Sequence, residues 1–147
     1  MTKKFKYLPH TAEIKFLAYG KNFRIAIENA AAAMLNVMLD VQKIKKMRGR
    51  IKSIEIKEKA ETKEDLVWYV LQDMLSKIDE KALAAYKFKI NEICAAGKAQ
   101  RQMELKGRLF YKELKGVFTL LDVKGVTSNE LKVKEGKTKS ITVVLDV

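Results

Sequence analysis

The sequence predicts an α+β fold in which a mostly antiparallel β-sheet carries two amphipathic helices. Two segments place apolar residues at helical spacing, and most of the remaining chain alternates apolar and polar residues as strands do. No internal repeat or low-complexity segment interrupts this order. A chain of 147 residues can bury a core without disulfides or structural zinc, so we expect one domain over residues 1–147.

The first predicted strand belongs to the stretch Tyr7–Gly20, around which the chain is organised. Pro9 predicts a turn, and the only histidine, His10, follows it directly. From Glu13 onward the residues alternate, and one face of the strand carries Ile14, Phe16 and Ala18. A proline, a histidine and a carboxylate at a strand entrance favour a ligand-holding site at the rim of the sheet.

Two helices are predicted by their caps and apolar stripes. Asn22 is a plausible N-cap for a helix over residues 23–39, and Thr62 with Asp65 resembles a capping box for a helix that ends near Asp79. The first stripe is Phe23, Ile27, Ala30, Ala31, Met34 and Met38; the second is Leu66, Val70, Leu71, Met74, Leu75 and Ile78. Both stripes are expected to face the core.

The segment between the helices is the most basic of the chain. Residues 41–52 carry six lysines and arginines, and Gly49 marks a turn. We expect a solvated loop here that leads into a strand containing Ile54 and Ile56. Contact with nucleic acid is the alternative interpretation, although no aromatic residues interleave with the charges to stack on bases.

The rest of the chain reads as β-structure. We expect strands over residues 86–91, 99–106 and 140–147, with a hairpin turn at Gly97–Lys98. The segment Val117–Lys124 is apolar on both sides and is expected to be a central strand that Gly125 breaks. Leu131 and Val133 then continue the sheet.

Composition limits the function classes. With 48% hydrophobic and 33% charged residues the chain is globular and not disordered, and no apolar run approaches the length of a membrane helix. The start lacks a signal-peptide core, and the only cysteine, Cys94, is expected to be a small buried hydrophobe, so we expect a cytoplasmic protein. The net charge of +12 fits a polyanionic partner such as RNA, and it equally fits general solubility.

Several kinds of catalysis lack their residues. The sequence has no nucleotide-binding glycine motif, no serine in a nucleophile elbow to pair with His10, and too few histidines and cysteines for zinc. The available oxygen ligands favour calcium, magnesium or manganese. Asp146 and Val147 would bring several anionic oxygens to one rim if their strand lies near Glu13; alternatively, Asp146 is a solvated chain end.

Four motifs together resemble the archease family. They are HTAEIKFLAYG, the helix segment ENAAAAM, the segment KGVTSNELKV and the terminal VVLDV. The likeness covers nearly the whole chain, and the first two motifs combined are fairly specific. It implies an archease-like α+β domain.

The resemblance also implies a function and a site. Archeases are accessory proteins of the RtcB-type RNA ligase in tRNA splicing, where they promote guanylylation of the ligase and multiple turnover; an older view casts them as chaperones of RNA-modifying enzymes. The family's metal-binding positions fall on Glu13 and Asp146, with Val147 beside the latter. Its KGVT lysine falls on Lys124, and we expect His10, Lys124 and Thr127 to lie near the metal or contact the partner.

Three departures from the family pattern stand out. Pro9 replaces an aspartate before the HTA motif, Glu13 replaces the motif's aspartate, and Ser128-Asn129 replaces Tyr-His. These changes favour a divergent member whose partner or metal dependence differs from that of the family. The leading expectation is an activator without turnover of its own; a basic RNA-binding or chaperone module acting on tRNA or a tRNA-modifying enzyme is the alternative, and a small hydrolase ranks third.

Overall fold

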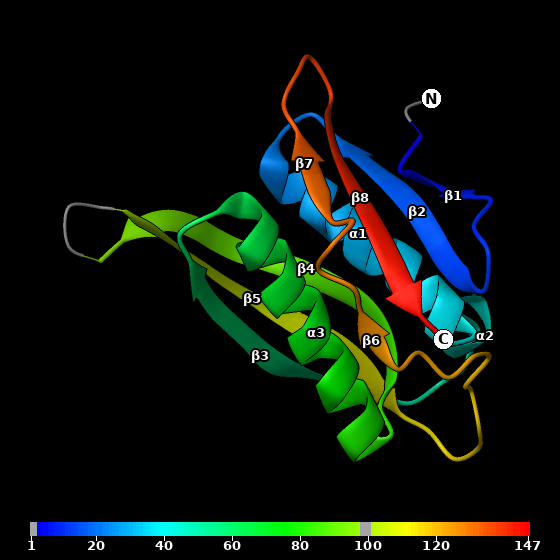
Figure 1. Cartoon of the computed structure of the whole chain (residues 1–147). Helices are drawn as coiled ribbons and strands as arrows, with labels where there is room; N and C mark the ends of the chain where they lie inside the picture. The colour runs from blue at the N-terminus through cyan, green and yellow to red at the C-terminus, as the bar shows by residue number, and fades with distance from the viewer. Residues whose placement is uncertain (1–2, 98–100) are drawn as a thin grey trace.

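The structure is a computed structural model that describes residues 3–97 and 101–147, with two antiparallel sheets packed around helices (Figure 1). The elements in chain order are β1 Phe5–Leu8, β2 Glu13–Gly20, α1 Phe23–Met38, α2 Val41–Lys46, β3 Arg50–Ala60, α3 Lys63–Lys81, β4 Ala84–Ala96, β5 Gln102–Glu113, β6 Gly125–Val126, β7 Lys132–Lys134 and β8 Lys139–Asp146. The predicted α+β class is confirmed, although the strands divide between two sheets where the sequence suggested one.

The larger sheet has the order β1-β2-β8-β6, and β7 also pairs with β8. β8 is therefore its central strand: one side pairs with β2 along the full length, while β7 and β6 share the other side. The inward residues are fully buried, as the alternation predicted; they include Phe16, Ala18, Ile141, Val143 and Leu145. The end of β8 lies between β6 and the start of β2, although β2 is far from β8 in the sequence.

The smaller sheet has the order β3-β5-β4 and forms a long hairpin with β3 added at its edge. At Gly107 the strands approach so closely that a Cβ atom would lie 2.7 Å from the Lys89 carbonyl oxygen and 2.8 Å from the Phe88 ring. Only glycine fits there, because real Cβ contacts are not this short. The absence of a side chain at Gly107 leaves the space that the Phe88 ring occupies.

Two long helices form the layer that joins the sheets. Helix α1 packs against β2 and β8 on one side and against β4 on the other, whereas α3 covers β3 and β6. Both predicted N-caps are confirmed: the Asn22 side chain accepts from the Ile25 amide, and the Thr62 side chain accepts from the Asp65 amide. Among the described residues, no helix combines the length and apolar content that a membrane crossing requires.

The prediction of a central strand over Val117–Lys124 is wrong. Apart from one bridge between Leu39 and Thr119, this segment is an irregular surface loop, and Val117 is 84% exposed. Gly125 does not break a strand but begins β6. Phe118 and Val123 are nevertheless buried, so an apolar run cannot by itself distinguish a strand from an irregular loop that buries only some of its side chains.

The basic segment and Cys94 also differ from expectation. Residues 41–46 form the short helix α2 and not a loop, because Asp40 caps the helix and Val41 and Ile44 bury one face. Cys94 is exposed and not buried: it pairs with Glu104 near the free end of the β4–β5 hairpin. This end of the hairpin extends beyond the helices (Figure 1). The predicted turn at Gly97–Lys98 and the strand start near Ala99 include residues outside those described; Gly97 has the positive φ of +80° that a tight turn favours.

Candidate functional site

The two predicted carboxylate positions face each other across neighbouring strands. Glu13 is the first residue of β2 and Asp146 the last of β8, and the register makes them direct Cα partners. Residues directly opposite on antiparallel strands place their side chains on the same face, with Cβ atoms about 4.5–5.5 Å apart. Glu13 is half-buried and Asp146 is exposed, so the pair is open to solvent at the rim.

The turn that leads into Glu13 is shaped by Ala12, whose φ of 59° lies in the left-handed region. This conformation costs a non-glycine residue of order 1 kcal/mol or more, and such strain gathers at functional sites. Ala12 lies between His10 and Glu13, and its conformation sets the direction in which the chain enters β2.

His10 is oriented by a residue that the sequence did not single out. Its Nε2 atom lies 3.4 Å from a carboxylate oxygen of Glu130, and the Lys15 ammonium lies 3.9 Å from the other oxygen. Glu130 belongs to the loop between β6 and β7, where an isolated charged residue gives no local signal of a distant contact. Only the pairing of β6 and β7 with β8 brings this loop to the entrance of β2.

Lys124 is fixed to the same rim through its backbone. Its amide donates to the Asp146 carbonyl oxygen at 2.7 Å, while its side chain is exposed. The strand that follows is held by α3: the Gln72 side chain accepts from the Val126 amide at 3.0 Å, and the Trp68 indole donates to the Val126 carbonyl at 2.7 Å. Lys124 thus directly precedes a well-anchored strand and lies beside Asp146.

Thr127 stabilises the end of β6 and does not present a free hydroxyl to the rim. Its amide and its hydroxyl both donate to the Val144 carbonyl oxygen, at 3.0 Å and 3.3 Å. Val147, the neighbour of Asp146, is half-buried and packs against the core. Of the predicted site residues, the structure therefore gathers Glu13, Asp146 and the Lys124 backbone most closely, and turns Thr127 toward β8.

A groove of about 570 Å³ adjoins the carboxylate pair. It is lined by Tyr7, Leu8, Pro9, His10, Glu13, Ile14, Lys15, Asn36, Val37 and Leu121. The Tyr7 hydroxyl donates to the Ala33 carbonyl at 2.8 Å, and burial raises the pKa of this phenol, so it remains neutral at physiological pH. Pro9, His10 and Glu13, which the sequence singled out, all line this groove.

The donor set fits a hard cation that keeps part of its water shell. Glu13 and Asp146 offer carboxylate oxygens on one face, which suit calcium, magnesium or manganese. In the described part of the chain, no group of three or more histidine, cysteine, aspartate or glutamate side chains is arranged to hold a metal. Any cation held here would therefore take its remaining ligands from backbone oxygens or water, as magnesium commonly does.

The fold and this rim define the class of protein: a small two-sheet α+β domain whose central strand ends in a carboxylate opposite a second one. The model of the Archease protein family (MTH1598/TM1083) matches residues 5–147. The chain belongs to the archease family.

Known relatives agree with this assignment. The chain is 33% identical over 134 residues to protein archease of Methanosarcina acetivorans, covering 90% of this chain and 88% of that protein. It is 30% identical over 150 residues to protein archease of Sulfurisphaera tokodaii, covering 99% of each. The solution structure of Methanobacterium thermoautotrophicum protein 1598 superposes with a TM-score of 0.78 at 25% identity, covering 99% of this chain and 100% of that one.

Proposed function

We propose that the protein is an accessory activator of an RtcB-type RNA ligase in tRNA splicing, promoting guanylylation of the ligase and its multiple turnover. The observation that carries the proposal is the direct pairing of Glu13 with Asp146 at an exposed rim, with Lys124 anchored beside them, in a chain of the archease family. These residues can contact phosphates and metal ions, which suits an accessory role beside the active site of another enzyme.

Each rim residue has a defined part in this proposal. Glu13 and Asp146 would hold a divalent cation, and that cation would supply positive charge to the phosphate oxygens of the ligase reaction. Lys124 offers its exposed ammonium to a phosphate as a mobile point charge. His10, oriented by Glu130 at 3.4 Å, lines the approach to Glu13, and Thr127 keeps β6 attached to β8.

The test is ligase turnover with the ligase limiting, in the presence and absence of this protein. We expect multiple turnover only when the protein is added, and we expect Glu13→Ala or Asp146→Ala to abolish the stimulation at near-normal stability, because both residues lie at the surface rim. Glu61→Ala, an exposed glutamate before α3, is the matched control and should retain stimulation. Stimulation that survives both rim substitutions would refute the site.

The basic surface supports the second candidate, a tRNA-binding or chaperone module in the cytoplasm. Lys43, Lys45 and Lys46 are exposed on α2, and Arg48 and Arg50 follow them on the surface. An RNA-binding module should bind tRNA alone with an affinity that falls steeply with salt. An activator should do little until the ligase is present, so filter binding at 50 and 200 mM salt without ligase separates the two functions.

A further inference from the structure

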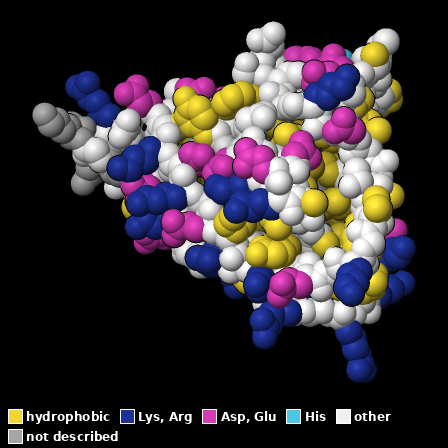
Figure 2. Space-filling model, turned by 90° about the horizontal axis from the view of Figure 1, so that it is seen from below, with side chains coloured by type: hydrophobic (Ala, Val, Ile, Leu, Met, Phe, Trp, Pro, Cys, Tyr) yellow, Lys and Arg dark blue, Asp and Glu magenta, His cyan; other side chains and the backbone are white. Residues whose placement is uncertain are grey.

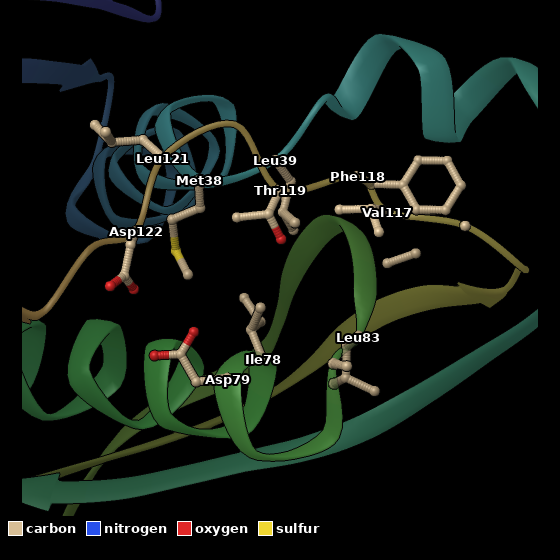
Figure 3. Close-up of a pocket in the computed structure, with 13 residues that line it drawn as sticks. Met38, Leu39, Ile78, Asp79, Leu83, Val117, Phe118, Thr119, Leu121 and Asp122 are labelled. Carbon is tan, nitrogen blue, oxygen red and sulfur yellow. The ribbon is translucent and has the colours of Figure 1, made fainter.

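A second pocket, away from the carboxylate pair at the sheet rim, opens between the C-terminal ends of α1 and α3 and the loop that follows β5 (Figure 3). Its volume is about 310 Å³. The interior is apolar and comes from side chains that are at most 8% exposed: Met38, Leu39, Ile78, Leu83 and Phe118. A volume of this size accommodates one extended side chain but not a large cofactor.

One end of the pocket is acidic. Asp79 on α3 and Asp122 on the loop direct their carboxylates toward each other there (Figure 3). Both residues are exposed, yet slight desolvation, and then the charge of Asp122, raise the pKa of Asp79, as expected for two neighbouring carboxylates. Within the described residues, no lysine, arginine or histidine nitrogen lies within 4.0 Å of either carboxylate.

The last turn of α3 adds to this negative potential. The Ile78 carbonyl accepts from the Ala82 and Leu83 amides where the helix ends, and a helix C-terminus carries about half a negative charge. On a chain with a net charge of +12, this pocket is therefore a local site that attracts cations.

The rim beside the pocket exposes large apolar side chains on a well-anchored loop. Val117 is 84% exposed and Leu120 is 60% exposed. The loop is nevertheless fixed to the end of α1, because the Asp40 amide donates to the Phe118 carbonyl and the Leu120 amide to the Met38 carbonyl, each at 2.8 Å. Figure 2 shows this underside of the molecule, where hydrophobic side chains gather in a hollow with charged side chains around it.

We propose that this pocket receives a lysine or arginine side chain of a partner protein, flanked on that partner by apolar residues. The aliphatic stem of the side chain packs on Met38 and Ile78, and its cationic head sits between Asp79 and Asp122. The exposed Val117 and Leu120 contact the flanking residues. Asp79 and Asp122 are both exposed, so the cationic head lies at the mouth of the pocket while the aliphatic stem lies inside it.

The position of the pocket connects it with the candidate site. Leu121 lines both this pocket and the groove that contains His10 and Glu13. A partner anchored here also covers the approach to the carboxylate pair. Naming the partner as the RNA ligase rests on the proposed function, whereas the preference of the pocket for a cation with an apolar stem does not.

The cation preference is tested with n-butylguanidinium, which carries the head and stem of an arginine side chain, and with N-butylurea as its neutral analogue. Methyl NMR of the Met38 and Ile78 methyl groups reports binding. We expect saturable shifts with n-butylguanidinium and not with N-butylurea.

The double variant Asp79→Asn/Asp122→Asn should weaken n-butylguanidinium binding about tenfold, the factor that 1.4 kcal/mol produces. Glu80 is an exposed neighbour that does not line the pocket, so Glu80→Gln should leave this binding unchanged.

Equal shifts with both probes, or unchanged binding in the double variant, would overturn the proposal. In a second measurement, ligase affinity should fall about tenfold in the double variant but not in Glu80→Gln. If the double variant binds the ligase as tightly as the wild type while the wild type binds n-butylguanidinium, the pocket holds a free cation. If the wild type is a dimer and the double variant is not, the pocket holds a second copy of this chain. Either result overturns the assignment of a partner protein to the pocket. If the ligase binds no version of the protein, the proposed function fails while the NMR titration still decides the chemistry of the pocket.

Discussion

Glu58, on β3, should make the stability of this protein depend on pH near neutrality. It faces Asp73 of α3, which is paired with the Lys77 ammonium at 2.9 Å. Burial, followed by the charge of Asp73 and a hydrogen bond with it, raises the pKa of Glu58 from its ordinary 4.5 to about 7, although Lys77 acts in the opposite direction. The two carboxyl groups can share a proton at low pH but repel each other once both are ionised.

The sign of the pH dependence of stability follows from whether the folded or the unfolded state binds the proton more tightly. Because the pKa of Glu58 is raised in the folded protein, its stabilising contribution is fully present below pH 4.5 and is lost as the pH rises through about 7. The difference between the two pKa values corresponds to at most about 3–4 kcal/mol. Glu58 is only half-buried, so solvent screening reduces the expected effect to about 1–2 kcal/mol.

The perturbation is Glu58→Gln, which keeps a hydrogen-bonding side chain of the same size and removes the charge. Urea unfolding at pH 4.5 should give nearly equal free energies of unfolding for the variant and the wild type. At pH 8.5 the variant should be more stable by about 1–2 kcal/mol, because the amide no longer repels Asp73. Glu55→Gln, an exposed position on the same strand, is the control and should show no such dependence.

A difference between Glu58→Gln and the wild type that is the same at both pH values would refute this reasoning, as would a variant that is less stable at pH 8.5. The first result would show that the side chain acts through packing alone. The second would show that Lys77 compensates both carboxylates in the folded state.

Three further substitutions test other parts of the structure. Gly107→Ala should destabilise the protein by about 1–3 kcal/mol in urea unfolding, since the added methyl group would overlap the Phe88 ring. Gly125→Ala, whose nearest atom would be 3.8 Å away, should cost clearly less, and equal costs would contradict the packing argument. Ala82→Gly should raise stability by about 0.5–1 kcal/mol, because Ala82 ends α3 at a φ of 49°; a lower melting temperature would be the opposite result. Lys124→Ala should change the free energy of unfolding by less than about 0.5 kcal/mol, because the hydrogen bond to Asp146 is made by the Lys124 backbone. The substitution should nevertheless lower ligase guanylylation. A loss of stability with intact stimulation would show that Lys124 has a structural role.

Local patterns were sufficient for most elements of the fold. The caps at Asn22 and Thr62 and the two apolar stripes predicted α1 and α3 to within a few residues, because capping and amphipathicity depend on neighbours along the chain. The alternation of β2 and β8 likewise predicted their buried faces. The archease motifs predicted the family, which the comparison confirmed.

The sequence failed where burial depends on what covers a segment. Val117–Lys124 looks like a central strand but is an irregular loop that exposes Val117 and Leu120. Cys94 looks buried but is exposed on a hairpin strand. Likewise, α2 was missed because two buried residues and one cap are too weak a helical signal. A hydrophobic side chain is more stable when it is buried, but the packing of elements distant in the sequence decides whether it is buried.

The sequence alone determined the residue types of the candidate site: carboxylates at positions 13 and 146 and a lysine at 124. Only the tertiary structure decided that Glu13 and Asp146 are direct partners, that Glu130 contacts His10, and that Asp79 meets Asp122 across a pocket. The physical reason is that strand register and helix packing bring together segments far apart in the chain. No local pattern encodes those contacts, since they exist only once the whole core has formed.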